Sequence, residues 1–172
     1  MSKQNNIFII GSTGAGKTTV GQALAEKLQL SFYDSDAAIE KAAGMSIAKI
    51  FAVGGEAVFR NYEEAAIERL TALNNIVLAT GAGAILSVKN QNLLVEKGRV
   101  VYLQVSLQQQ YERTKRCQER PLLQVSDLQT KLEKMSQERD HFYEKIADLT
   151  IKTDQFSLEN IVKKIAKIHG FI

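Results

Sequence analysis

Short strand-like runs alternate along the chain with stretches in which apolar residues recur at helical spacing. The runs indicate β-strands at residues 7–10, 32–33, 76–79, 100–105 and 149–152, of which those at 7–10 and 76–79 have the continuous apolar character of buried strands. The stretches between them indicate helices at residues 17–28, 56–73, 107–116, 127–143 and 157–168. Because strands and helices alternate, the pattern predicts an α/β fold with a parallel sheet covered on both faces.

The last predicted helix has apolar residues on one face and Lys163, Lys164 and Lys167 on the other. A basic helix lying on a membrane surface has this pattern. A helix that packs on a core and keeps its lysines in solvent has it too, and is far more common. The apolar run at residues 7–10 is too short for a signal peptide or a membrane span. We therefore expect no membrane association and a cytoplasmic protein.

Length and composition are those of one soluble domain spanning residues 1–172. The chain is 45% hydrophobic and 24% charged, as in ordinary globular proteins. Its net charge of +3 is too small to indicate a nucleic-acid partner, although it suits an anionic ligand. Cys117 is the only cysteine, so no internal disulfide can form, which fits a reducing compartment.

The clearest motif is GSTGAGKT at residues 11–18, which matches the phosphate-loop pattern G-x-x-x-x-G-K-[ST]. A predicted strand precedes it and a predicted helix follows. Its glycines let backbone N–H groups converge on phosphate oxygens at a helix N-terminus. Lys17 would reach the β- and γ-phosphates, and the Thr18 hydroxyl would ligate Mg²⁺. The alternative is a glycine-rich turn that only starts a helix, but the context favours nucleoside triphosphate binding.

Two carboxylates follow the second predicted strand, at Asp34 and Asp36. At the carboxyl end of a parallel strand they would lie near the phosphate loop. One could hold the water shell of Mg²⁺, and the other could accept a hydrogen bond from a hydroxyl that is to be phosphorylated. The alternative is that Asp36 or Ser35 only caps the next helix. Beside a phosphate loop we favour the functional interpretation, and a capping role is compatible with it.

Arg60 and Glu63 lie three residues apart on a predicted helix and therefore share a face. One interpretation is a surface ion pair, which contributes little. The other is a guanidinium held in place by a carboxylate so that it grips an anionic substrate with two parallel hydrogen bonds.

A basic segment at residues 113–123 contains the single proline of the chain. Such a segment could close over a triphosphate and exclude water. A solvated helix end, with cations near the C-terminal dipole, accounts for Lys115 and Arg116. It accounts less well for Arg120, which directly precedes Pro121.

The sequence ATGAGA at residues 79–84 places two glycines around Ala82 where a buried strand should end. Ligands collect at this edge of open α/β sheets, and glycine allows a sharp turn or close approach of the backbone. Alanine is strained if residue 82 needs a positive φ. An alanine is tolerated if φ is negative and only the backbone N–H is needed to bind a ligand. We favour the second case, because Gly81 and Gly83 can absorb unusual dihedral angles.

Taken together, these stretches resemble the shikimate kinase family, nearly from end to end. The resemblance rests on the motifs GSTGAGKTT, FYDSD, GGEAVFRNYEE, VLATGAGA, VVYL, RPLL and ERDHFYEKIAD. It implies a phosphate-loop NTPase fold of three layers, α/β/α, around a five-stranded parallel sheet. It also implies a substrate-binding helical segment near residues 36–62 and a lid near residues 113–125.

The resemblance further implies a role for each matching residue. Nucleotide binding falls to Gly14, Ala15, Gly16, Lys17, Thr18, Thr19, Arg113 and Arg120. Substrate binding falls to Asp36, Arg60, Gly81, Ala82, Gly83 and Arg139, with Phe51 and Phe59 as pocket walls. Catalysis falls to Lys17, Asp36 and Arg120. Mg²⁺ would be held by Thr18 and, through water, by Asp34.

The implied activity is ATP-dependent phosphorylation of the 3-hydroxyl of shikimate by a monomer, in chorismate and aromatic amino acid biosynthesis. The family usually has a third glycine where this chain has Ala82. Two alternatives are a kinase for another small polyol acid and a nucleotide-binding regulatory switch. The combination of Asp36 with Arg60 and Arg139 disfavours the switch, which needs no acceptor site, and also a nucleotide acceptor, whose phosphate needs a more cationic site.

Overall fold

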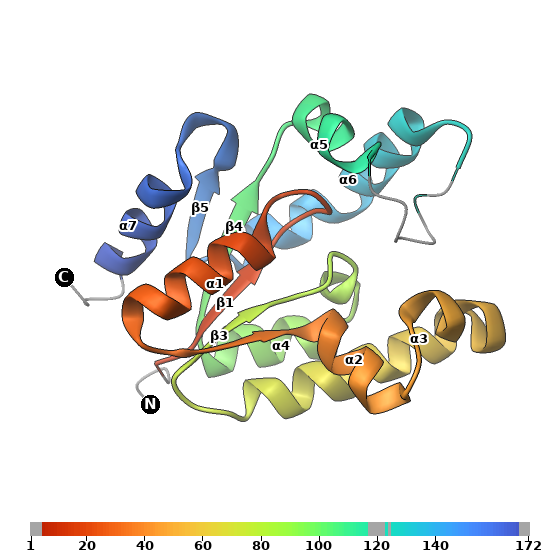
Figure 1. Ribbon diagram of the computed structural model, residues 1–172, viewed down its shortest axis with the longest axis horizontal. Coiled ribbons are helices and arrows are strands. Elements are labelled where there is room, and N and C mark those ends of the chain that lie inside the picture. Colours follow the sequence, from red (N-terminus) through yellow and green to blue (C-terminus); the bar gives the residue numbers. More distant parts are fainter. Residues whose placement is uncertain (1–4, 117–122, 124, 169–172) are drawn as a thin grey trace.

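A five-stranded parallel sheet forms the centre of the computed structural model, which describes residues 5–116, 123 and 125–168 (Figure 1). Its strands are β1 (Ile7–Ile10), β2 (Ser31–Asp34), β3 (Ile76–Ala79), β4 (Arg99–Gln104) and β5 (Leu149–Lys152). Their spatial order is β2-β3-β1-β4-β5, and every neighbouring pair is parallel. The predicted parallel sheet is confirmed, and each strand lies within two residues of its expected position.

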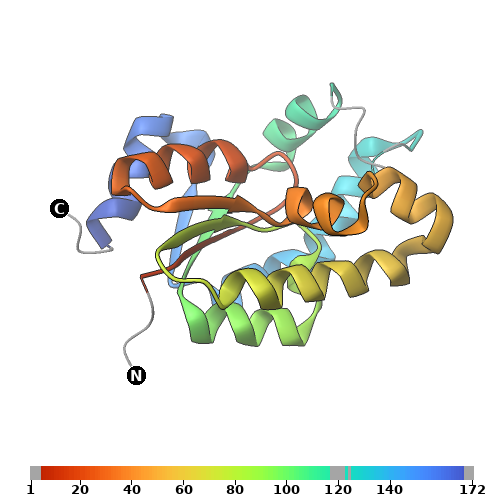
Figure 2. The same ribbon diagram turned by 60° about the horizontal axis from the view of Figure 1, so that its bottom comes forward.

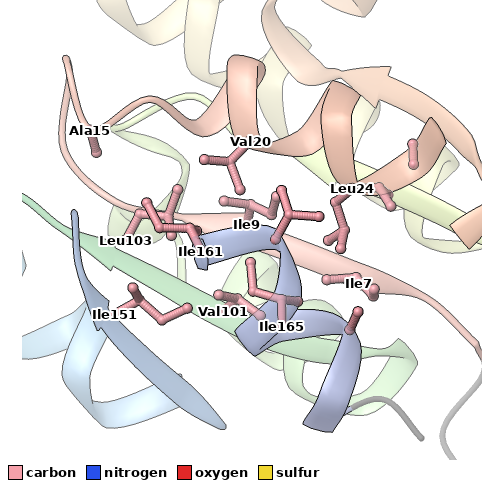
Figure 3. Close-up of a cluster of buried hydrophobic side chains, with 14 residues drawn as sticks. Ile7, Ile9, Ala15, Val20, Leu24, Val101, Leu103, Ile151, Ile161 and Ile165 are labelled. Carbon is pink, nitrogen blue, oxygen red and sulfur yellow. The ribbon is translucent and has the colours of Figure 1, made fainter. Parts of the chain in front are cut away.

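Helices cover both faces of the sheet, which gives the three layers seen in Figure 2. They are α1 (Lys17–Leu28), α2 (Ser35–Ala43), α3 (Ile47–Thr71), α4 (Val88–Lys97), α5 (Leu107–Thr114), α6 (Leu128–Ile146) and α7 (Leu158–Ile168), with two short 3₁₀ turns at Ala84–Leu86 and Thr153–Gln155. On one face α1 and α7 bury Val20, Leu24 and Ile165 against alternate strand residues (Figure 3). On the other face α3, α4 and α6 bury Ile67, Leu94 and Tyr143.

Hydrophobic periodicity did not predict α4, α2 or the first part of α3. The family resemblance implied helical structure near residues 36–62, which covers the last two of these. Helix α4 turns Asn90 and Gln91 toward the protein interior, so its buried face has no apolar periodicity. Helix α3 begins well before the expected start at residue 56. A kink at Gly55 (φ 73°) separates its first part from the rest, so the helical periodicity is interrupted there and indicates only the second part. Helix α2 is short and alanine-rich, with Ile39 as its buried apolar residue.

The strand order determines where the motifs meet. Strand β1 lies between β3 and β4, so the chain leaves adjacent strands toward opposite sides of the sheet, and the crevice at such a switch point is where open α/β sheets bind ligands. The phosphate loop follows β1, Asp34 ends β2, and the loop with Ala82 follows β3. Three separate sequence motifs are therefore brought to one edge of the sheet.

In the part of the chain that the structure describes, no single helix is long and apolar enough to cross a membrane. Only α2 and α3 together, bent by 88°, meet the requirements of length and composition.

A buried asparagine joins the amino-terminal ends of three strands. The Asn6 amide nitrogen donates to Leu73 O at 2.7 Å, and its carbonyl oxygen accepts from Ile76 N at 3.2 Å. We expect Asn6→Ala to lower the free energy of unfolding by about 2 kcal/mol, because buried backbone groups next to β3 lose their partners. Urea unfolding measures this. The neighbouring exposed Asn5 provides a control, since Asn5→Ala should change stability by less than about 0.5 kcal/mol. Equal effects at both positions would contradict this role for Asn6.

Candidate active site

The phosphate loop is shaped by glycines and leaves a helix start exposed to a ligand. Gly14 and Gly16 have φ of 78° and 88°, which other residues rarely adopt. Helix α1 begins at Lys17 without a side-chain cap and without an acidic residue in its first turn. Its first N–H groups and the positive end of its dipole are thus arranged for an anion. The Lys17 ammonium donates to Gly11 O and Ser12 O, both at 2.8 Å.

Ala15, one of the residues with an expected role in nucleotide binding, does not present its side chain to solvent. Its side chain is buried in the core beside α1 (Figure 3). Its N–H donates to Ser12 O at 3.2 Å. Ala15 therefore fixes the shape of the loop by packing and by an internal hydrogen bond.

A hydroxyl and a carboxylate meet beside the phosphate loop. Thr18 Oγ1 donates to Asp34 Oδ2 at 2.8 Å, and Asp34 Oδ1 accepts from Asp36 N at 2.9 Å. Asp34 is thus the N-cap of α2, so the alternative in which Asp36 or Ser35 caps this helix is wrong. Among the described residues no group of three His, Cys, Asp or Glu forms a metal centre. One hydroxyl and one carboxylate instead fit Mg²⁺, which keeps several waters and takes phosphate oxygens as ligands.

One cavity of about 630 Å³ lies next to this loop, and all six residues expected to bind the acceptor line it. These residues are Asp36, Arg60, Gly81, Ala82, Gly83 and Arg139. Phe51 and Phe59 also line it, with ring centroids 4.8 Å apart. The sequence motifs that carry these residues come from α2, α3, α6 and the loop after β3.

The glycines of the loop after β3 are required for space. A Cβ at Gly81 would lie 2.7 Å from Asp36 Oδ1, and one at Gly83 would lie 2.6 Å from Arg60 Nη2. Neither glycine has a positive φ, and Ala82 has none either. The expectation of a negative φ at Ala82 is confirmed, whereas the unusual dihedral angles expected at its neighbours do not occur. The two glycines leave room for a carboxylate and a guanidinium.

The N–H groups of this loop differ in availability. Gly81 N donates to the buried Ser35 Oγ at 2.8 Å, so this group is occupied within the protein. Among the described residues the N–H groups of Ala82 and Gly83 have no hydrogen-bond partner. Both residues line the cavity, so these two donors are the ones available to a ligand.

Arg60 is held on two sides by carboxylates. Its Nη1 lies 2.7 Å from Glu63 Oε1, and its Nη2 lies 3.0 Å from Glu56 Oε1. Glu63 is only 1% exposed, so the interpretation as a surface ion pair is wrong. Burial raises the pKa of Glu63 to about 6, against the opposing effect of Arg60. Burial alone would lower the pKa of Arg60, but Glu63 and Glu56 raise it above its ordinary value.

Arg139 enters the cavity from α6 and is 7% exposed. Its Nε lies 3.7 Å from Glu138 Oε2 and has no hydrogen-bond partner in the described part of the chain. A buried donor on a cation is costly unless an acceptor satisfies it. Because the Nε is itself inaccessible, a ligand would meet other atoms of Arg139, which lines the cavity with a positive charge that suits an anion.

The lid predicted at residues 113–125 lies largely outside the described residues, and Arg120 and Cys117 are among those not described. Arg113, at the end of α5, donates from Nη1 to Gly14 O at 2.8 Å. It therefore contacts the phosphate loop, on the side where a nucleotide would lie.

Three residues that contribute to the site were not found from the sequence. Glu56 pairs with Arg60, Ser35 accepts from Gly81, and Tyr143 donates its hydroxyl hydrogen to Ala82 O at 2.5 Å. Glu56 has a detectable signal, because it lies four residues before Arg60 on the same helix. Ser35 and Tyr143 act on backbone atoms that are distant in sequence, and no local pattern indicates such contacts.

Comparison with known proteins is consistent with this site. The family model described as shikimate kinase matches residues 13–169. A shikimate kinase of Legionella pneumophila is 49% identical over 165 residues, which cover 96% of this chain and 94% of the relative. The solved structure of a shikimate kinase from Acinetobacter baumannii in complex with shikimate is 41% identical, with a TM-score of 0.93 over 97% of this chain and 93% of that one.

A second solved shikimate kinase, from Bacteroides thetaiotaomicron, is 30% identical with a TM-score of 0.88, and the alignment covers 95% of this chain and 97% of that one. The family match covers residues 13–169, which include most of the phosphate loop, the residues that line the acceptor cavity, and α6. This chain belongs to the shikimate kinase family.

Proposed function

We propose that this chain transfers the γ-phosphate of ATP to the 3-hydroxyl of shikimate, giving shikimate 3-phosphate and ADP. The observation that carries the proposal is the position of the acceptor cavity beside the phosphate loop, with both Arg60 and Arg139 among the residues that line it. A carboxylate would pair with the Arg139 guanidinium, and Arg60 would complete a two-sided clamp. Asp36, on the same cavity wall, would accept a hydrogen bond from the hydroxyl that attacks.

On the nucleotide side, the first turn of α1 and Lys17 would bind the β- and γ-phosphates. Thr18 would hold Mg²⁺ directly and Asp34 would hold it through water, an arrangement that their 2.8 Å contact supports. When bound, Mg²⁺ neutralises charge on the transferring group. Arg113 would lie against the adenine, and Arg120, which is outside the described residues, would contact the phosphates from the lid.

Catalysis on this proposal is direct in-line transfer, with little covalent chemistry for the protein. The two ligands are placed so that the acceptor hydroxyl meets the γ-phosphate, and fixed charges stabilise the transition state. Asp36 orients the hydroxyl and takes up its proton as the bond to phosphorus forms. We also propose a cytoplasmic monomer. The location is proposed because the single cysteine fits a reducing compartment.

An acceptor panel distinguishes this proposal from its alternatives. ADP release from ATP and Mg²⁺ should be saturable with shikimate, and the product should carry its phosphate on the 3-hydroxyl. Quinate, gluconate and nucleoside monophosphates, tested at equal concentration, should give little turnover. Faster turnover with one of these acids or nucleotides would assign a different kinase activity. ATP binding without any acceptor-dependent turnover would favour the regulatory switch.

The buried Glu63 predicts an unusual pH dependence of stability. Its pKa of about 6 in the folded protein exceeds the ordinary value of 4.5, so the folded state holds its proton more tightly. The resulting stabilisation is fully present below pH 4.5 and is lost as the pH rises through 6. Glu63→Gln cannot titrate. The unfolding free energy of the wild type, relative to this variant, should therefore fall by about 1.5 kcal/mol between pH 4.5 and pH 7.

Urea unfolding of both proteins at several pH values measures this difference, because every other titrating group is shared. Parallel stability profiles for the two proteins would show that Glu63 titrates in the folded state as it does in the unfolded chain. A difference of opposite sign would show that the ion pair with Arg60 outweighs burial.

A further inference from the structure

Tyr143 contacts the loop after β3 (residues 80–83), here called the acceptor loop, in a way that packing does not require. Its ring is 1% exposed and stacks on Tyr102 of β4, with centroids 5.1 Å apart. A phenylalanine would fill the same space. The hydroxyl nevertheless reaches the loop after β3 and donates to Ala82 O at 2.5 Å. Burial raises the pKa of the Tyr143 phenol, so the hydroxyl keeps its proton and acts as a donor.

The contact fixes one particular peptide unit. Ala82 O and Gly83 N belong to the same planar trans peptide, so they point in opposite directions. Holding the carbonyl oxygen on the α6 side therefore sets the direction of the Gly83 N–H. This N–H has no partner among the described residues, and Gly83 lines the acceptor cavity. A hydrogen bond to the carbonyl also polarises the peptide and strengthens its N–H as a donor.

The rest of the loop, and the 3₁₀ turn that follows it, are held by buried side chains from other elements. Ser35 Oγ accepts from Gly81 N at 2.8 Å, Asn90 Nδ2 donates to Ala84 O at 3.0 Å, and Gln91 Nε2 donates to Ile85 O at 2.8 Å. None of these contacts involves the peptide between Ala82 and Gly83. Tyr143 is thus the described side chain that hydrogen-bonds this unit.

Tyr143 also connects the loop to the opposite wall of the cavity. It lies four residues after Arg139 on α6, so the two side chains emerge from the same helical face one turn apart. The hydrogen bond therefore sets the distance between the Arg139 guanidinium and the Gly83 N–H.

We propose that Tyr143 is a positioning residue for the acceptor. Its hydroxyl directs the Gly83 N–H toward the cavity and sets the position of this donor relative to Arg139. Tyr143 itself contacts no reacting atom in this assignment. The inference rests on the proposed function for the identity of the acceptor, shikimate, but the orientation of the peptide can be tested without turnover.

Tyr143→Phe and Tyr102→Phe form a matched pair of variants. Both remove one hydroxyl from the same buried stack, but the Tyr102 hydroxyl bonds to Gln104 of its own strand. In Tyr143→Phe we expect the KM for shikimate to rise about 5- to 10-fold and the KM for ATP to stay within about twofold, because Ala82 O loses its donor. In Tyr102→Phe both KM values should stay within about twofold of the wild type.

Amide hydrogen exchange gives a second readout that does not depend on activity. The Ala82 and Gly83 amides should exchange faster in Tyr143→Phe than in the wild type and in Tyr102→Phe. In the wild type, shikimate should protect the Gly83 amide more than the Gly81 amide, which is already bonded to Ser35. This last measurement needs no variant and stands even if Tyr143→Phe does not fold.

Each result decides the matter. A lower melting temperature in Tyr143→Phe, with unchanged KM for shikimate and unchanged exchange, would show that Tyr143 serves packing alone. Equal increases in KM in both variants would indicate general loosening of the core and would also overturn the proposal. If the wild type does not phosphorylate shikimate, the proposed function fails. Faster loop exchange confined to Tyr143→Phe would still support positioning, and equal exchange in the two variants would refute it.

Discussion

The acceptor site depends on two positions that have no side chain. At Gly81 and Gly83 a Cβ would lie within 3 Å of the Asp36 carboxylate and the Arg60 guanidinium, respectively. Two opposite charges therefore occupy the volume that side chains would otherwise fill, at the carboxyl end of a buried strand. Ala82 stands between them without backbone strain, because its φ is not positive.

This arrangement has an electrostatic consequence. Arg60 and Glu63 lie together beside this loop. Burial disfavours the ionised form of Glu63 and raises its pKa to about 6. Buried charges are stabilised only when partners and hydrogen bonds satisfy them. Arg60 has two carboxylate partners at hydrogen-bond distance, whereas Arg139 has one carboxylate, that of Glu138, 3.7 Å from its Nε. The cavity is therefore lined by one arginine that the protein orients through two carboxylates and by one whose charge a ligand carboxylate would pair.

The sequence was sufficient for those features that local physics determines. The phosphate loop follows the buried strand β1, and Asp34 and Asp36 lie at the end of β2, so their motifs could be recognised from the sequence alone. Helix α4 could not be recognised, because polar residues take apolar positions on its buried face. Asn90 and Gln91 donate there to carbonyls of the 3₁₀ turn that follows the loop after β3. The cap of α2 was misassigned, because Asp34 serves both the helix and Thr18. Tyr143 was not found as part of the site, since its contact with Ala82 spans 61 residues of sequence.

The position of Arg60 requires that residue 83 has no side chain, and shikimate binding to Gly83→Ala tests this most directly. By titration calorimetry we expect the affinity for shikimate to fall at least about tenfold, because the new methyl displaces the guanidinium from its carboxylates. The affinity for a non-hydrolysable ATP analogue should remain within about twofold of the wild type. Ala82→Gly, which changes the middle of the same loop, should weaken shikimate binding far less. Wild-type affinity for shikimate in a folded Gly83→Ala protein would contradict the account.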